Sequence, residues 1–484
     1  MAESQSNQRG DRLSELPDSL ILHILSFLPM RHVVQTTLLS KRWADLWRTV
    51  SSLTFDDGTN DAAEQEQFLE FPLFVNRAMS LWKGTEILKF HAAFDYTCWD
   101  YASSDLDVWL RVAMDKQVQV LSLNLTKSEE NINRYHRDDD SDIDDGDFGG
   151  DDLYTVPPRL FSCSSIRELS LAACNVRFGG NVRWDKLEFL KIEGVRLSDG
   201  LVGRVVSGSP RLEVLILRVV ESHDDLNIQS ESLRRLTVEK YYRGDPAKHT
   251  MLTIWAPNLE SLEILGVVYR MVVLVNVASL IDVDLGFCGW DECHGLLGEM
   301  MVYVFECICR ARNVTLSKWC VKMLVMMKKR GSLSVSSDAK YLKLSGNKQE
   351  IIELLEMYPN LTTLVIEVLH GVREPEYPSL LEIRQAYFRD NSPAITTPKL
   401  FMKKLSSFSK ESLMQLRRVE ITWIATDTSV YPLIELVFKC SPLEKMVLRV
   451  QQLTSLQPPS MFVLTRKLLR MRRSSPAVEV SFFG

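Results

Sequence analysis

The chain of 484 residues has 45% hydrophobic and 25% charged side chains, which excludes an intrinsically disordered protein and suffices for a large core or a repeat array. Its net charge of −6 arises from residues 129–152, which hold 11 acidic and two basic side chains, so the remainder of the chain lies near +3. Without a strong positive field, no nucleic acid partner is expected.

The N-terminus and the most apolar stretch predict neither export nor a membrane span. Residues 1–10 are polar, lack the apolar run of a secretory signal and are expected to form a disordered tail. Residues 262–285 are the most apolar but include Glu263, Asp282 and Asp284 and alternate as strands do, so we expect them in a core and expect no membrane partner. Nine cysteines at irregular spacing favour reduced thiols in the cytoplasm, the nucleus or both.

Residues 11–57 predict a compact block of three short helices. Pro17 suits the first turn of a helix, and apolar side chains then recur at helical spacing until Pro29 ends it. A second short helix is expected over about residues 30–37, and Ser40 can cap a third helix. So short a segment cannot bury all of its large apolar side chains by itself, so part of this surface is expected to meet a partner.

The motifs of this block occur in the order Leu16-Pro17-Asp18, Ile24-Leu25-Ser26, Leu28-Pro29 and Leu39-Ser40-Lys41-Arg42-Trp43. In this the block resembles the F-box, the adaptor-binding motif of substrate receptors in cullin-RING ubiquitin ligases. The resemblance implies a Skp-type adaptor as partner and, through it, cullin and RING subunits. It also implies nine adaptor-contacting residues: Leu16, Pro17, Ile21, Leu28, Pro29, Leu38, Ser40, Trp43 and Trp47. The alternative is that several of these residues only hold the three helices together.

Beyond the block, a Leu-x-x-Leu-x-Leu phrase recurs ten times between residues 118 and 366. Its last two apolar positions are two apart and therefore face the same side of a strand, and the spacing falls within the range of leucine-rich repeats. Each repeat is expected to supply one parallel strand and, on the convex side, a helix or an irregular segment. The fold class expected is therefore α/β: an N-terminal three-helix F-box followed by an irregular leucine-rich-repeat solenoid over residues 80–370, with parallel strands on the concave face.

Two segments interrupt this pattern. The acidic residues 127–152 predict a flexible loop inserted in the solenoid, and their register does not fit a calcium-binding loop. Residues 371–400, with four prolines, predict an irregular linker. Residues 401–484 then predict a strand, a helix and a strand. They resemble the FBD region that ends many plant F-box proteins with leucine-rich repeats, including Leu-Glu-Lys-Met-Val at 443–447, and can cap the solenoid.

The sequence contains no catalytic motif that would make the protein an enzyme. Its only metal-like cluster comprises Cys288, Cys293, His294, Cys307 and Cys309, whose spacing fits no zinc site. We therefore predict buried structural cysteines, no metal and no cofactor.

These features together predict a non-catalytic substrate-recognition subunit of a Skp-cullin-F-box E3 ubiquitin ligase, whose solenoid holds an unknown target protein. Candidate target contacts lie between the two buried positions of successive phrases and so point outward. They are Ser170, Lys191, Ile216, Thr237 and Glu263. Each could equally be ordinary solvated sheet surface. Two other functions remain open: a hormone-type receptor that binds a small molecule in the repeats, and an adaptor-bound scaffold without ubiquitin output.

Overall fold

A computed structural model describes residues 16–57, 70–94, 96, 102–125, 153–197, 200–221, 225–240, 250–267, 270–288, 294–368, 413–424, 430–440, 442–451 and 478–483. The chain divides into two compact units: residues 1–136 with 140–212 form unit 1, and residues 137–139 with 213–484 form unit 2. Three expectations lie outside the described residues, namely the disordered tail 1–10, the acidic loop 127–152 and the linker 371–400.

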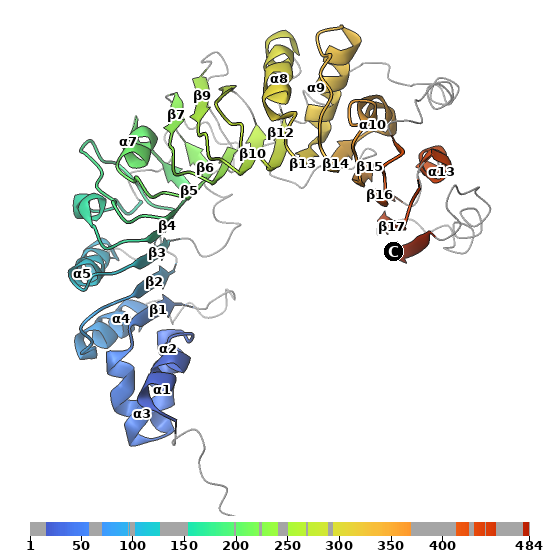
Figure 1. Ribbon diagram of the computed structural model, residues 1–484. Helices are drawn as coiled ribbons and strands as arrows, with labels where there is room; N and C mark the ends of the chain where they lie inside the picture. The colour runs from blue at the N-terminus through green and yellow to red at the C-terminus, as the bar shows by residue number, and fades with distance from the viewer. Residues whose placement is uncertain are drawn as a thin grey trace, which may run out of the picture. The chain divides into compact units, whose positions relative to one another are not determined.

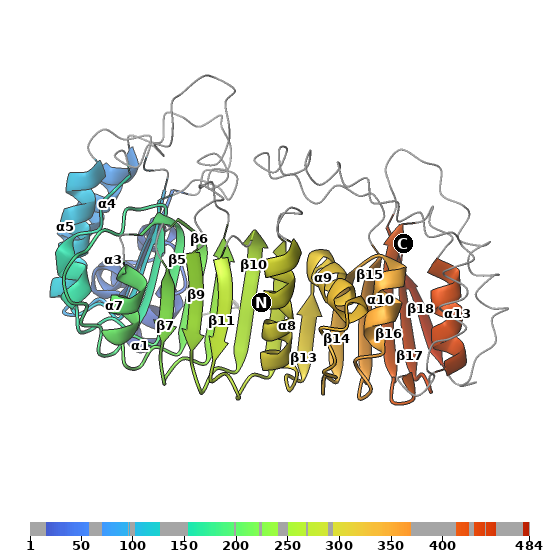
Figure 2. The same cartoon turned by 90° about the horizontal axis from the view of Figure 1, so that it is seen from above.

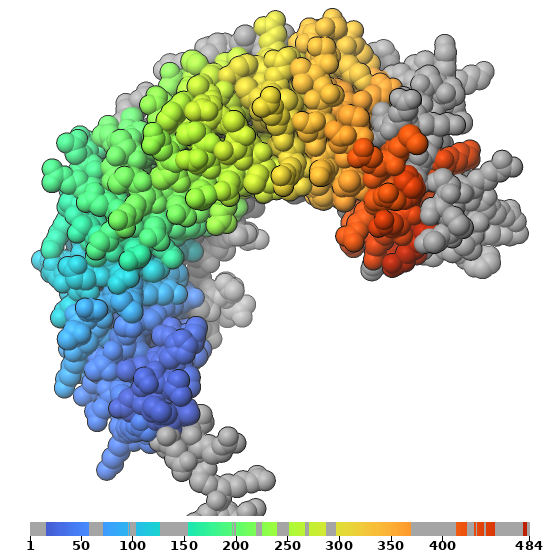
Figure 3. Space-filling model, in the orientation of Figure 1, coloured from blue at the N-terminus to red at the C-terminus, as the bar shows by residue number. Residues whose placement is uncertain are grey.

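Unit 1 starts with the three short helices α1 (Asp18–Leu25), α2 (Met30–Gln35) and α3 (Lys41–Leu46), drawn in blue in Figures 1 and 3. Pro17 and Pro29 directly precede α1 and α2, where a fixed φ and a missing N–H cost nothing. Ser40 occupies the N-cap position of α3 as expected. Its hydroxyl, however, accepts no capping hydrogen bond. The interior of this block is formed by Ile21, Leu25, Met30, Val33, Trp43 and Trp47.

The sheet of unit 1 is parallel, with strands that follow one another in chain order. It consists of β1 (Ser52–Asp56), β2 (Lys89–Ala93), β3 (Val120–Asn124), β4 (Glu168–Ala172) and β5 (Phe189–Arg196). Helices α4 (Glu70–Leu81), α5 (Ala102–Asp115) and α7 (Leu201–Ser207) lie on one side of it (Figure 1). The first strand, β1, lies within the range 11–57 that the sequence predicted for the F-box.

Two hydrogen bonds join the segment after α3 to the segment after α4. The indole Nε1 of Trp82 donates to the carbonyl of Val50 over 2.8 Å, and the amide of Lys83 donates to the carbonyl of Arg48 over 2.7 Å. Buried backbone carbonyls are costly to leave unpaired, so these bonds fix the helical block to the first repeat.

Unit 2 contains a parallel sheet in the order β6-β8-β10-β12-β13-β14-β15-β16-β17-β18 (Figure 2). Its strands are β6 (Val214–Glu221), β8 (Arg235–Lys240), β10 (Ser261–Val267), β12 (Asp282–Cys288), β13 (Asn313–Leu316), β14 (Tyr341–Gly346), β15 (Thr363–Val368), β16 (Arg418–Ile424), β17 (Lys445–Gln451) and β18 (Glu479–Phe483). On one face lie α8 (His294–Ile308), α9 (Lys318–Lys329), α10 (Lys348–Leu355) and α13 (Tyr431–Cys440). None of the described helices lies on the other face, on the inner side of the curve that these strands follow in Figure 1, and we call it the helix-free sheet face.

The repeat phrase and the α/β fold class are confirmed. All ten predicted phrases contribute a strand, from β3 to β15, and in each the last two apolar side chains are buried, as in Leu262 and Ile264 of β10. A recurring turn starts the strands, since the amides of Leu187, Leu212 and Leu259 each donate to the carbonyl three residues earlier. The strand, helix and strand expected after residue 415 are β16, α13 and β17, and β18 extends the sheet further.

One expectation for the other side of the solenoid was incomplete. Where a helix or an irregular segment was expected, unit 2 has a second, parallel sheet of three strands in the order β7-β9-β11. They are β7 (Leu226–Gln229), β9 (Thr250–Trp255) and β11 (Arg270–Val275). The valines of β11 and the alternation in β9 favour extended chain. The apolar stretch 262–285 thus includes most of β10, all of β11 and the start of β12, and among the described helices none is long and apolar enough to cross a membrane.

Candidate functional site

The first candidate site is the outer surface of the helical block, where large apolar side chains are exposed. Leu38 and Phe27 are 88% and 73% exposed, and Leu39, Leu20 and Ile24 are exposed as well. Several large apolar side chains exposed on one small folded block often mark a protein interface. This surface is therefore suited to a protein partner.

The nine predicted adaptor contacts divide by burial. Leu38 and Pro17 are exposed, and Leu16, Leu28, Pro29 and Ser40 are half-buried. The three remaining residues, Ile21, Trp43 and Trp47, are buried and pack inside the block. In the chain as it stands, these three hold the helices together, and their contact with an adaptor stays a prediction.

Four exposed apolar residues of the block were missing from the predicted contacts: Leu20, Ile24, Phe27 and Leu39. The sequence did contain a signal for three of them. Leu20, Ile24 and Phe27 recur at helical spacing beside a second such series that starts at Ile21, and a short helix can turn only one apolar face toward its own small core. Which of the two faces is outward depends on how α3 packs against α1.

The five predicted target contacts lie on successive strands, all half-buried between buried neighbours. In unit 1, Ser170 of β4 is the register partner of Lys191 of β5. In unit 2, Thr237 of β8 lies between Ile216 of β6 and Glu263 of β10 in the register. The geometry of the phrase is thus as expected, while their contact with a target stays a prediction.

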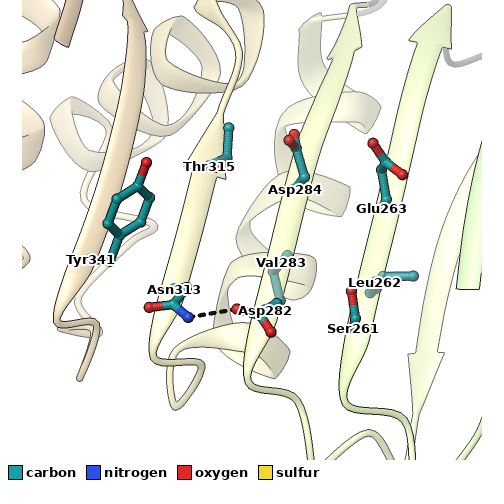
Figure 4. A pocket seen from close by; sticks show the side chains of 9 residues that line it. All are labelled: Ser261, Leu262, Glu263, Asp282, Val283, Asp284, Asn313, Thr315 and Tyr341. Atoms are coloured by element: carbon teal, nitrogen blue, oxygen red, sulfur yellow. Dashed lines mark hydrogen bonds between the residues drawn. The ribbon is translucent and has the colours of Figure 1, made fainter. Parts of the chain in front are cut away.

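The second candidate site is a hollow of about 420 Å³ in the helix-free sheet face of unit 2 (Figure 4). Its volume is at the small end of the roughly 300–1,000 Å³ typical of ligand sites. It spans β10, β12, β13 and β14, and the side chains that give it its chemistry are Glu263, Asp282, Asp284, Asn313, Thr315 and Tyr341. Only Glu263 belongs to the contacts predicted from the sequence.

The register of the parallel strands sets the order of these groups. Glu263 lies directly opposite Asp284, and Asp284 lies opposite Thr315. The hydroxyl of Thr237 donates to Glu263 over 2.9 Å, and the amide of Asn313 donates to Asp282, as the dashed line in Figure 4 marks. Burial, and then the charge of Glu263, raise the pKa of Asp284 to about 6, against an opposing effect of Lys343.

Replacing Asp284 by asparagine is expected to stabilise the fold at about pH 7.5 and to have almost no effect near pH 3, below the ordinary pKa of 3.8. The pKa raised from 3.8 means that the folded state disfavours the ionised carboxylate, so the wild type loses stability as the pH rises through about 6. Because the side chain keeps solvent contact, the gain in free energy of unfolding is expected to be about 1 kcal/mol. Urea unfolding at both pH values measures it.

The matched variant is Asp282→Asn, on the same strand but exposed, for which no such gain is expected. A wild type that is as stable as Asp284→Asn near neutral pH would contradict the unfavourable ionisation of Asp284.

Two other residues of the hollow, Asp284 and Thr315, could have been found from the sequence. Asp284 and Thr315 occupy, in later copies of the phrase, the same outward position as Glu263, between the buried pairs of β12 and β13. The contacts predicted from the sequence included no residue after the sixth phrase, which contains Glu263. Asn313 and Tyr341 each lie two residues before the outward position of their phrase. Only the register of β13 and β14 shows that they are neighbours.

Part of the cysteine cluster lies among the described residues. Cys307 and Cys309 are only half-buried, whereas the sequence predicted that they would be buried. The Cys307 thiol lies 3.7 Å from the carbonyl oxygen of Leu274. The side chains of Cys288, Cys293 and His294 lie outside the described residues. Within the described part of the chain, no three His, Cys, Asp or Glu side chains are grouped so that they could hold a metal ion.

Comparisons with known proteins agree with this architecture. Residues 13–55 match the family model of the F-box domain, and residues 106–283 match that described as FBD-associated F-box protein At5g56370, LRR repeats. F-box/LRR-repeat protein At3g03360 of Arabidopsis thaliana is 26% identical over 75% of this chain and 72% of its own length. F-box/FBD/LRR-repeat protein At1g13780 of the same plant is 27% identical over 78% and 82%. F-box/FBD/LRR-repeat protein At3g52680 is 31% identical, but over only 52% of this chain and 45% of its own length.

A helical block that matches the F-box domain, followed by parallel strands that match leucine-rich repeats, is the arrangement of F-box proteins with leucine-rich repeats, and this chain is similar to them. Among these proteins it is similar to the F-box/FBD/LRR-repeat proteins of Arabidopsis thaliana.

Proposed function

We propose that this protein is the substrate-recognition subunit of a Skp-cullin-F-box E3 ubiquitin ligase. The F-box binds a Skp-type adaptor, which connects it to cullin and RING subunits, and the repeat strands hold a target protein. The matches to the F-box domain and to leucine-rich repeats support this proposal, because F-box proteins with such repeats typically act as substrate adaptors of these ligases. The complex would act in the cytoplasm, the nucleus or both.

The observation that carries the proposal is the exposed apolar surface of the F-box. Leu38 and Phe27 present large side chains to water, at 88% and 73% exposure, within a block that also buries two tryptophans. Covering such side chains yields about 25 cal/mol per Å² of apolar surface removed from water. A protein adaptor that covers this surface accounts for its composition.

The protein would perform no chemistry of its own in this complex. A separate RING subunit and conjugating enzyme transfer ubiquitin, and the receptor keeps a target lysine close to them. Holding two reactants together converts an encounter between free molecules into a local one with a high effective concentration. Its contribution to the reaction is therefore proximity and choice of target.

The hormone-type receptor gains no support from the hollow. An anionic small ligand would require convergent basic and aromatic groups, whereas the described lining has three carboxylates, one tyrosine and no basic residue.

The proposal is tested by capture of the adaptor and cullin from a plant extract. A double variant, Phe27→Glu with Leu38→Glu, is expected to lose at least about 90% of both, since charges on this surface oppose apolar burial. Unlike replacements of buried Trp43 or Trp47, these changes leave the interior of the block intact. The matched control is Leu73→Glu with Met414→Glu, two side chains that are 69% and 64% exposed outside the F-box, and it should capture both proteins normally.

Folded wild type that captures no adaptor would contradict the proposal. Capture of the adaptor without any cullin would instead favour the scaffold without ubiquitin output.

A further inference from the structure

Charges on the helix-free sheet face of unit 2 are mostly paired across strands. Arg218 pairs with Glu239 over 3.3 Å, and Lys343 of β14 pairs with Glu367 of β15 over 2.9 Å. Farther along the sheet, Arg449 lies 2.5 Å from Glu420, and Lys445 lies 3.3 Å from Glu479. Opposite charges on adjacent strands are mutually stabilising, so this arrangement is the one expected of a solvated sheet face.

The hollow departs from this pattern. Glu263, Asp282 and Asp284 occur on two adjacent strands, and none of them forms an ion pair with another described residue. Their hydrogen bonds come from neutral groups, Thr237 for Glu263 and Asn313 for Asp282. Adjacent strands lie about 4.8 Å apart, so Glu263 and Asp284 face each other as like charges, which is unfavourable unless a cation from outside joins them.

The rest of the lining indicates what kind of cation fits. The carboxylates lie on β10 and β12, neutral Asn313 and Thr315 lie on β13, and the ring of Tyr341 lies beyond them on β14 (Figure 4). A small metal ion would need its ligands gathered around one point, and no such group occurs among the described residues. A cation on a long apolar stem suits a hollow with charge on one side and an aromatic ring on the other.

We propose that this hollow binds an arginine or lysine side chain of a basic segment in the target protein. The inference rests on the proposed function, because it names the chemistry of the target that the repeat strands would hold. Arginine should be preferred, because its planar guanidinium has five donors that can bridge two carboxylates and its flat face can stack on Tyr341.

The test measures binding of fluorescent glycine-serine peptides, carrying either arginines, lysines or glutamates, to the full chain by fluorescence anisotropy. The arginine peptide is expected to bind most tightly and the glutamate peptide not at all. The double variant Glu263→Gln with Asp284→Asn should weaken arginine-peptide binding by about tenfold or more, since both charges that face the cation are removed.

The matched control is Glu420→Gln with Glu479→Gln, which removes two ion-paired carboxylates of the same sheet outside the hollow. It should change the affinity by less than about twofold, because a general loss of negative charge has only a screened, long-range effect. Both double variants keep the acidic residues 129–152, so binding of the peptide to that segment would be equal in the two.

Protonation gives a second readout. Glu263 of β10 and Lys343 of β14 are the charged groups that face Asp284. A bound cation favours the ionised carboxylate, so wild-type affinity should rise by about threefold or more between about pH 5 and pH 7.5. In Asp284→Asn this rise should be reduced.

Equal affinity of wild type and the Glu263→Gln, Asp284→Asn variant would overturn the inference, as would tight binding of the glutamate peptide or of Ca²⁺ alone. The variant must still capture the Skp-type adaptor, because its F-box is unchanged. A variant of the hollow that loses peptide binding but still captures the adaptor therefore tests this inference. A variant of the F-box that loses adaptor capture but still binds the peptide tests the proposed ligase function.

Discussion

Replacing Trp184 by alanine is expected to lower the free energy of unfolding by about 3–5 kcal/mol, because the indole is fully buried between the strands and the turns of unit 1. Its ring stacks on Phe161 with centroids 5.4 Å apart, and its Nε1 donates to the carbonyl of Leu160 over 2.8 Å. Truncation would leave both a cavity and a buried carbonyl without its donor, and the two costs add. The effect should be measured by urea unfolding.

Two further variants separate these costs. Trp184→Phe keeps most of the apolar volume but removes the Nε1 donor, so it should cost about 1–2 kcal/mol. Trp255→Ala removes an indole of the same size from a half-buried position in unit 2 and should cost less than Trp184→Ala. Repeat proteins can unfold in parts, so hydrogen exchange of peptides from residues 153–212 should locate the loss in unit 1. Exchange that rises only in unit 2 would contradict the assignment.

The second large effect is expected at Gly208, which ends α7. A Cβ at this position would lie 2.2 Å from the carbonyl oxygen and 2.7 Å from the carbonyl carbon of Val182. Both are backbone atoms and cannot rotate away, and the same glycine accepts the amide hydrogen of Trp184 over 2.9 Å. Gly208→Ala should therefore cost about 2–3 kcal/mol through backbone displacement, measured as the shift of the urea midpoint.

Gly179 provides the matched control in the same unit. A Cβ there would meet no atom within 4 Å, so Gly179→Ala should change the free energy of unfolding by less than about 0.5 kcal/mol. If the two alanine variants are equally stable, then close backbone approach does not explain the glycine at 208. The contrast is sharp because both substitutions add the same methyl group.

Both substitutions act on the unit that carries the F-box. Trp82 and Lys83 bond to carbonyls of residues 50 and 48, so the helical block is continuous with the first strands of the repeat array. A variant that loosens residues 153–212 should nevertheless still capture the adaptor, since each repeat contacts mainly its neighbours. We therefore expect the proposed binding of the adaptor and the stability of the later repeats to be separable.

The repeat strands could be predicted from the sequence because their signal is local. In a strand, residues two apart face the same side, so Leu262 and Ile264 had to point inward and Glu263 outward once the phrase was recognised. The same holds for the apolar pairs of the other nine phrases, all of which are buried. The helical block could be predicted equally well, because Pro17 and Pro29 directly precede α1 and α2.

Properties that depend on neighbours distant in the sequence could not be predicted in this way. The strands β7, β9 and β11 form a second sheet because segments of similar propensity from three repeats lie side by side, and isolated strands of this length have no stability alone. Likewise, α1 has two apolar faces, and only its packing against α3 decides that Ile21 is buried and that Ile24 is exposed.

The sequence by itself determined that the chain has an F-box, a set of parallel repeat strands and outward side chains between the buried leucines, because these follow from local periodicity. Only the tertiary structure decided which outward side chains meet. The register of β10, β12, β13 and β14 places Glu263 opposite Asp284, with Tyr341 two strands beyond Asp284's strand. The carboxylate of Asp284 acquires its unfavourable ionisation from burial and from the charge of Glu263 on the adjacent strand, 21 residues away along the chain.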